Sequence, residues 1–310
     1  MIRNLAQLRT FELVARTGNL SAAARSLGVS QPAVSGQIAR LEREHATVLF
    51  ERVRRRLVLT AAGQGLRQDV RRVFAVLDEA EQRLAQTRDL RVGVLRLAAS
   101  VTSSSYDALD LMSAFRGRHP GVSVQLFTGN STRVVERVVA LEADVGLVAA
   151  NVTHRELARH LLFVDPVVLV VPCRHALARH RTISIGRLSR EPLVLRETGS
   201  ATRALIEQQF AAHGVDVNMA MEVSSNEVIK RIAAMGQGVG VVSRRSVIDE
   251  MRAGHLRTVA IHAGGRLIRQ QVYLVHHVER RDALLVRAVL EIVRELHATR
   301  RWREPSKGIS

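Results

Sequence analysis

The first 45 residues contain short apolar helical patterns separated by single glycines, and this feature constrains the fold more than any other part of the chain. Apolar residues recur with helical spacing from Leu5 to Ala15, and Gly18 follows as a stop signal. A short second segment ends at Gly28, because glycine takes the left-handed conformation that a tight corner needs. The pattern therefore predicts short helices joined by tight corners.

Polar residues mark where these helices begin. Ser21 is expected to cap the second helix, and Ser30 the third. Pro32 lies in the first turn of the third helix, where its missing N–H costs little. That helix should run to about Glu44 with an inward face of Val34, Ile38 and Leu41. Helices arranged in this way form a helix-turn-helix, in which the later helix enters the major groove of DNA.

The segment resembles a known family. Residues 20–35 read LSAAARSLGVSQPAVS, which is similar to the signature of LysR-type transcription regulators. Residues 49–52 (LFER) and 57–63 (LVLTAAG) also match in order and spacing. The resemblance implies a winged helix-turn-helix, a long linker helix and a two-lobed α/β effector domain. It implies a sequence-specific regulator whose DNA binding or bending responds to a small effector. A structural helix pair with no role in DNA binding is the alternative.

By this resemblance the helix starting near Gln31 enters the major groove. Glutamine can read adenine edges, and proline can pack against a thymine methyl group. Arginines at positions 52 and 54–56 fall in a hairpin wing, where they would contact phosphates or the minor groove; a solvated arginine run is the alternative. The implied DNA-binding residues are Ser21, Ser30, Gln31, Pro32, Ser35, Gln37, Arg40, Arg52, Arg54 and Arg55.

Two positions depart from the family pattern. Gly36 stands where many members carry a longer polar residue, so one base contact is missing. Residues 45–48 read HATV in place of the usual Leu-Gly-Val-Pro, which removes the glycine that commonly ends this helix. The turn after the third helix must therefore close in another way.

A long helix is expected from a cap at Thr60 to about Asp89. Its apolar residues are spaced alternately four and three apart, which is the pattern of a coiled-coil seam: Leu66, Val70, Val73, Leu77, Ala80 and Leu84. The seam predicts a partner helix, and the resemblance implies a homodimer that assembles into a homotetramer. Burial of this face against the chain's own sensor domain is the alternative.

Beyond residue 92 short β-type runs alternate with helical patterns, which predicts an α/β domain. It resembles the effector-binding domain of LysR-type regulators, which shares the plan of periplasmic solute-binding proteins. The expected division is as follows: 1–59 DNA-binding domain; 60–91 linker and dimerisation helix; 92–303 effector domain, with lobe one at 92–163 and 268–303 and lobe two at 164–267; 304–310 tail.

Small polar residues gather where β runs pass into helices. Helix N-termini carry free N–H groups and partial positive charge, so several of them around one cleft would suit an anion. Each residue taken singly could be an ordinary helix cap. The expected effector-binding residues are Ser100, Thr102, Ser103, Asn130, Ser131, Ser200, Thr202, Ser225 and Asn226.

The motifs of the second lobe look most like regulators of carbon fixation, sulfur or phosphonate metabolism. That likeness points to an effector bearing phosphate, phosphonate, sulfate or carboxylate. Ala149 stands where those relatives often have Glu, so the chemistry of this pocket can differ.

The net charge is consistent with a polyanionic partner, but it does not show which part of the chain binds that partner. The formal net charge is +17, and every basic residue except Lys230 and Lys307 is Arg, a bias that a GC-rich genome also produces. Aromatic residues make up 3% of the chain, which counts against modules that stack single-stranded bases.

Other classes lack their sequence features. No metal-ligand spacing, nucleophile elbow, P-loop or dinucleotide fingerprint occurs, so no cofactor or metal is expected, although an enzyme using the cleft is the alternative function. Cys173, the single cysteine, is expected to be a half-buried strand thiol. No apolar signal core or membrane-spanning run is seen, so a cytoplasmic protein that binds no membrane is expected.

Overall fold

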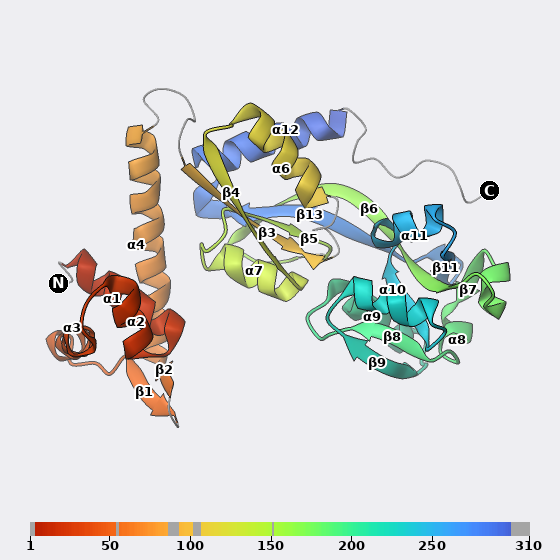
Figure 1. The fold of residues 1–310 in the computed structure, drawn as a ribbon, viewed down its shortest axis with the longest axis horizontal. Helices are drawn as coiled ribbons and strands as arrows, with labels where there is room; N and C mark the ends of the chain where they lie inside the picture. The colour runs from red at the N-terminus through yellow and green to blue at the C-terminus, as the bar shows by residue number, and fades with distance from the viewer. Residues whose placement is uncertain (1–3, 54–55, 86–92, 102–106, 151, 299–310) are drawn as a thin grey trace. The chain divides into compact units, whose positions relative to one another are not determined.

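The computed structural model describes residues 4–53, 56–85, 93–101, 107–150 and 152–298, and the chain forms two compact units, Met1–Thr87 and Arg88–Ser310 (Figure 1). Within the described residues, no helix is both long and apolar enough to span a membrane.

The N-terminal unit is a three-helix head with a hairpin and a long helix. Its elements are α1 (Leu5–Thr17), α2 (Leu20–Leu27), α3 (Gln31–Glu44), β1 (Phe50–Val53), β2 (Arg56–Leu59) and α4 (Ala61–Ala85). β1 and β2 pair antiparallel as the wing. Phe11, Val34 and Leu41 are almost completely buried and lie in one core that also includes Phe50. The expected winged helix-turn-helix is therefore present.

The helix boundaries follow most of the expected signals. Gly18 and Gly28 both adopt left-handed conformations at the ends of α1 and α2. Ser30 caps α3, since its hydroxyl accepts from the Ala33 N–H at 3.4 Å. The expectation that Ser21 caps α2 is wrong. Asn19 is the cap, and its side-chain oxygen accepts from the N–H of Ser21 itself at 2.8 Å, because the helix begins one residue before Ser21.

The turn after α3 closes without glycine. Ala46 takes the left-handed conformation (φ 47°) that a glycine would otherwise occupy. The carboxylate of Glu42 accepts from the N–H groups of Leu49 and Phe50, at 2.8 and 3.2 Å. These bonds hold the start of the wing against α3 and offset the conformational cost at Ala46.

The long helix α4 begins as expected, because the Thr60 hydroxyl accepts from the Gly63 N–H at 3.1 Å. A Cβ at Gly63 would come within 2.2 Å of the Leu49 carbonyl oxygen, so α4 can only approach the head at a glycine. The expected apolar seam is divided. Leu66 and Val70 pack into the core of the head, whereas Val73 and Leu77 are 40% and 36% exposed.

The second unit is a mixed sheet with helices on both faces. Its strands are β3 (Gly93–Ser100), β4 (Val122–Gly129), β5 (Val145–Val148), β6 (Leu157–Pro172), β7 (Thr182–Ser184), β8 (Leu193–Arg196), β9 (Met219–Val223), β10 (Val239–Ser243), β11 (Leu256–Ala263), β12 (Arg266–Leu267) and β13 (Arg269–His277). Its α-helices are α6 (Asp107–Arg118), α7 (Ser131–Val139), α8 (Ile185–Leu188), α9 (Ala201–Ala212), α10 (Asn226–Ala234), α11 (Ile248–Arg252) and α12 (Leu284–Ala298), and its short 3-10 helices are η1 (Ala176–Arg179), η2 (Arg244–Val247) and η3 (Val278–Arg280).

The long strands β6 and β13 join the two halves of this unit. The main strand order is β4-β3-β5-β13-β6-β10-β8-β9. The first part of β6 pairs with β13, and its last part pairs with β10 and β11. We call the half with β3, β4, β5, α6, α7 and α12 lobe one, and the half with β7–β11 and α8–α11 lobe two (Figure 1). Each lobe has a core on both faces of its sheet.

The expected α/β organisation of the second unit is present, since strands and helices alternate along it. The expectation for Cys173 is wrong: it is exposed and follows the end of β6 in a turn, and its thiol donates to the Gly254 carbonyl at 3.0 Å. Pro172 ends the strand one residue earlier, so Cys173 is not a strand residue.

Candidate functional site

The N-terminal half of α3 presents a polar surface. Gln31 and Pro32 are exposed, Ser35 is half-buried, and Val34 points into the core. Gly36 is also exposed, and no atom lies within 4 Å of the position its Cβ would take. This part of α3 is therefore accessible to base edges in a DNA groove.

Two of the expected DNA-binding residues are held by neighbours in the head. The Thr10 hydroxyl lies 2.6 Å from Oε1 of Gln37, which fixes this amide against α1. Arg40 pairs with Glu44 one turn later at 2.7 Å, but both side chains are exposed, so this pair is weak and can open. Neither contact removes these residues from the exposed side of the helix.

The start of α3, the start of α2 and the wing meet in a pocket. Ser21, Gln31, Arg52 and Arg56 line it, together with Gly18, Asn19, Leu20 and Leu57. The wing is tied to this corner because the Leu57 N–H donates to the Gly18 carbonyl at 3.0 Å. The pocket thus joins three of the expected residues with Arg56, and its two guanidinium groups suit a phosphate. Arg54 and Arg55 lie outside the described residues.

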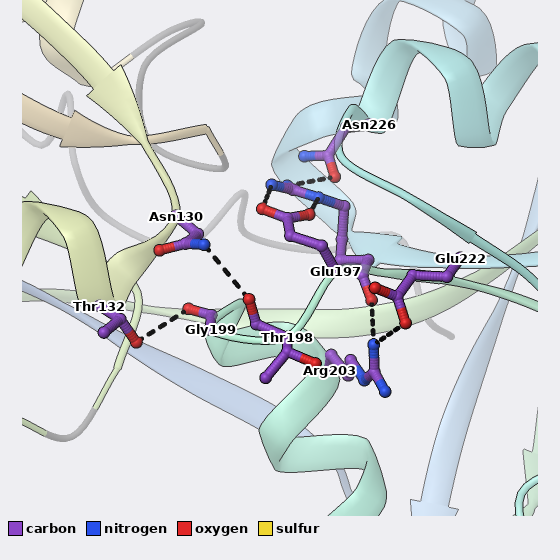
Figure 2. Close-up of polar contacts among 9 residues, drawn as sticks. Asn130, Thr132, Glu197, Thr198, Gly199, Arg203, Glu222 and Asn226 are labelled. Atoms are coloured by element: carbon purple, nitrogen blue, oxygen red, sulfur yellow. Dashed lines mark hydrogen bonds and ion pairs between the residues drawn. The ribbon is translucent and has the colours of Figure 1, made fainter. Parts of the chain in front are cut away.

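On lobe one, the start of α7 is occupied by a loop of lobe two. Asn130 caps α7 by accepting from the Arg133 N–H at 3.0 Å, and its amide nitrogen donates to the Thr198 carbonyl at 3.3 Å (Figure 2). The Thr132 N–H and hydroxyl both lie 3.4 Å from the Gly199 carbonyl oxygen. Ser131, the first residue of α7, is buried. Asn130, one of the two residues expected to hold an effector here, therefore already donates to a protein carbonyl.

On lobe two, an ion pair between a buried arginine and a half-buried glutamate lies at the end of β8. The Arg196 guanidinium donates to both carboxylate oxygens of Glu197, at 2.8 and 2.9 Å, and to Oδ1 of Asn226 at 3.1 Å (Figure 2). Asn226 begins α10, after the cap position Ser225. Ser225 and Ser200, the cap position of α9, make no side-chain capping bond.

The remaining expected effector residues fall into two groups. The buried Thr202 hydroxyl donates to Oε1 of Gln270 on β13 at 2.9 Å, and Ser100 is buried at the end of β3. Thr102 and Ser103 lie outside the described residues.

Sequence reasoning did not select Arg196, Glu197 or Gln270. The one available signal was the charged pair directly after the buried β run 193–195.

A second buried cluster joins the two lobes. Arg245 of η2 pairs with Asp107 of α6 at 2.6 Å, and its guanidinium carbon lies 4.4 Å from the ring centre of Phe163. Asp165 on β6 accepts from the Ser243 hydroxyl. Burial, which outweighs the nearby arginine, raises the pKa of Asp107 to about 7, and burial raises the pKa of Asp165 to about 6. The cluster therefore binds protons near neutral pH.

Both units match models of one protein family. Residues 5–64 match the model "Bacterial regulatory helix-turn-helix protein, lysR family", and residues 88–298 match "LysR substrate binding domain". The chain belongs to the LysR family of transcription regulators. This regulator acts on DNA, and it is not an enzyme.

Its relatives include carbon-fixation regulators, as the second-lobe motifs predicted. It is 31% identical to the HTH-type transcriptional activator CmpR of Synechocystis over 93% of each chain. It is 34% identical to the RuBisCO operon transcriptional regulator of Allochromatium vinosum, over 94% of this chain and 95% of that one. The solved regulatory domain of Synechocystis CcmR in complex with 2-PG is 27% identical and covers 68% of this chain and 100% of its own, with a TM-score of 0.62.

Proposed function

We propose that this LysR-type regulator reads duplex DNA with the first half of α3 and holds it through the wing. The observation that carries this proposal is the exposed start of α3 beside the pocket that contains Arg52 and Arg56. Gln31, Pro32 and Ser35 would contact base edges, and the arginines would contact phosphates. Arg54 and Arg55, between the two strands of the wing, would add to the phosphate contacts.

Substitutions on α3 test the base-reading part. Gln31→Ala and Ser35→Ala should weaken binding to a duplex selected from a random library by roughly 1–3 kcal/mol, the cost of losing a specific base contact. Binding to random duplex should change less. Gln64→Ala, an exposed glutamine on α4, is the matched control. Fluorescence anisotropy measures both affinities, and equal losses on selected and random DNA would remove the base-reading role.

Arg52→Ala tests the phosphate contact. It should weaken binding to selected and random duplexes alike and lower the slope of log affinity against log salt by about 1, because one phosphate contact releases about one counterion. An unchanged salt slope would show that the pocket does not hold a phosphate.

We also propose that the protein pairs through α4 and assembles into a homotetramer on a pseudo-palindromic site. Exposed apolar residues on α4 and α1 support pairing: Leu5, Val73, Val76 and Leu77. The groove between α1 and α4 is lined mainly by apolar side chains. Residues 60–91 would be the linker and dimerisation helix, between a head of 1–59 and an effector domain of 92–303 with a tail of 304–310.

Leu77→Asp should break this pairing, because it places a charge on the apolar face. Gln68→Asp is the matched control, since residue 68 is exposed and lies half a turn away around the helix. Light scattering measures the mass of both variants. A wild-type mass for Leu77→Asp would place the dimer contact elsewhere.

The effector would be a small anion bound between the lobes of a protein that works in the cytoplasm, where bacterial DNA lies. The side chains expected to line this site are Ser100, Asn130, Ser131, Ser200, Thr202, Ser225 and Asn226, with Thr102 and Ser103 of the same sequence cluster. Among them, Ser200 and Ser225 support the site, because neither makes a side-chain capping bond. The relative CcmR binds 2-PG. A thermal-shift screen of 2-PG, phosphate, sulfate and small carboxylates tests the proposal, and a footprint with and without the hit tests whether DNA binding responds.

A further inference from the structure

Arg196 is a buried cation whose charge is already balanced. Its side chain is 2% exposed, and Glu197 accepts two hydrogen bonds from it. Burial raises the pKa of Glu197, but the hydrogen bonds and charge of Arg196 outweigh this and hold that pKa below its usual range. The pair therefore stays ionised and adds no net charge to the region between the lobes.

The third contact of Arg196 fixes the orientation of Asn226. A guanidinium group can only donate hydrogen bonds, so the Asn226 atom 3.1 Å away must be the amide oxygen. The amide nitrogen makes no hydrogen bond with Arg196, and in Figure 2 it lies on the side of Asn226 toward which Asn130 is drawn. Asn226 is 6% exposed, and its nitrogen has no hydrogen-bond partner in the described part of the chain.

A buried donor without a partner is unfavourable, and a ligand oxygen would remove that cost. The backbone points to the same kind of ligand, because Asn226 is the first residue of α10 and Ser225 provides no side-chain cap. The first-turn N–H groups and the amide nitrogen are all donors, and the helix N-terminus carries partial positive charge. The lobe-one helix α7 differs, since Asn130 and Gly199 already satisfy its N-terminus.

We propose that Asn226 is the lobe-two donor to an oxygen of the anionic effector, and that Arg196 and Glu197 are positioning residues that aim its amide. This rests on the proposed effector function and specifies it. The ligand group is a carboxylate, phosphoryl or sulfonyl group, which offers only acceptors. It is bound by an amide and a helix N-terminus and not by the Arg196 charge, because Glu197 and Asn226 occupy the guanidinium.

Asn226→Asp provides the main test. The change keeps the size of the side chain and its contact with Arg196 but replaces the donor by a carboxylate that repels an anion. Calorimetric titration of the full chain with 2-PG, and separately with inorganic phosphate, should show at least a tenfold loss of affinity. Circular dichroism and size-exclusion chromatography check that the variant is folded, because a buried carboxylate beside an arginine that Glu197 already neutralises is not expected to stabilise the protein.

Asn218→Asp is the matched control, since it makes the same change at an exposed asparagine of lobe two. It should leave the affinity for both probes within about twofold. Wild-type affinity in Asn226→Asp, or an equal loss in both variants, would overturn the assignment.

Arg196→Lys tests the positioning role. Lysine keeps the positive charge but cannot hold two carboxylate oxygens and an amide in one plane. Its loss of affinity should approach that of Asn226→Ala, and the double variant should bind no more weakly than Asn226→Ala alone. Fully additive losses would show that Arg196 acts through the fold and would overturn its positioning role. If no probe binds the wild-type protein, the anionic effector itself is wrong; if the wild type binds and these variants do not differ from it, only this inference fails.

Discussion

The buried carboxylates of Asp107 and Asp165 should make the second unit less stable as the pH rises from about 5 to about 7. In the folded protein their pKa values are about 7 and about 6, and both start from 3.8. At pH values between 3.8 and the raised pKa of each group, the folded state keeps a proton that the unfolded state has released. Stability therefore falls with rising pH in this window and levels off above pH 7.

The magnitude follows from the number of protons involved. One such group lowers the free energy of unfolding by about 1.4 kcal/mol per pH unit. Asp107 alone should therefore contribute roughly 2 kcal/mol between pH 5 and 7, because it is already half ionised at pH 7, and Asp165 acts mainly in the lower half of the range. The groups that face Asp107 are Arg245, Asp165 and Asp110, and Arg244 and Ser243 also act on Asp165.

Asp107→Asn removes one titrating group while keeping its shape. Variant and wild type should have similar stability near pH 5, where Asp107 is already neutral, and the variant should become the more stable one as the pH rises. Urea unfolding of the full chain, followed by circular dichroism, measures this difference. The contribution of the N-terminal unit to the free energy of unfolding is the same in variant and wild type at each pH, so it cancels in the comparison. Asp110→Asn, one turn along the same helix and half-buried, is the control. Parallel pH profiles for wild type and Asp107→Asn would refute the reasoning.

Three further substitutions test individual features. Ala46→Gly should stabilise the head by up to ~1 kcal/mol in thermal unfolding, because Ala46 is left-handed; a loss would contradict this. Gly199→Ala should weaken the contact between the lobes and speed hydrogen exchange of the Thr132 N–H, since its Cβ would lie 2.8 Å from the Asn130 amide nitrogen at φ +92°. Thr202→Val should destabilise the second unit by ~1–3 kcal/mol, because it leaves the Gln270 oxygen buried without its donor; unchanged urea unfolding would show that another donor replaces it.

Local signals in the sequence were sufficient for the head. Gly18 and Gly28 end helices because each adopts a left-handed backbone conformation, and Ser30 and Thr60 cap helices by hydrogen bonds to N–H groups three residues later. Both features depend only on neighbouring residues, so the sequence can indicate them. Ser21 was misplaced because Asn19, two residues earlier, competes for the same capping role. The capping residue is the one just before the first residue of the helix. α2 begins one residue before Ser21, so Asn19 becomes the cap.

The linker seam shows where periodicity stops being informative. A period of alternating four and three residues predicts a buried face but not what covers it. Leu66 and Val70 are covered by the head of the same chain, and the apolar surface continues through exposed Val73 and Leu77. One apolar stripe therefore contributes to the core of the head and also remains exposed further along the helix.

The long-range side-chain contacts of the second unit were beyond local reasoning. Arg196 and Asn226 are separated by 30 residues, Thr202 and Gln270 by 68, and Arg245 is far from Asp107 along the chain. Small polar residues at strand ends indicated which helix termini matter. They did not indicate which termini the protein satisfies itself, because that depends on groups far along the chain, such as the Thr198 and Gly199 carbonyls that accept hydrogen bonds from the start of α7.

That difference between termini determines how an anion could act on the lobes. An anion at the start of α7 must displace the Gly199 carbonyl from Thr132, so binding there favours separated lobes. An anion at the start of α10 meets an unpaired Asn226 nitrogen and breaks no described contact, so binding there is compatible with joined lobes. A ligand shifts a conformational equilibrium only by its difference in affinity for the two states. The same small anion would therefore favour separated lobes when it binds at α7 and leave the lobe equilibrium unchanged when it binds at α10, so Gly199→Ala should strengthen binding at α7 while leaving binding at α10 unchanged.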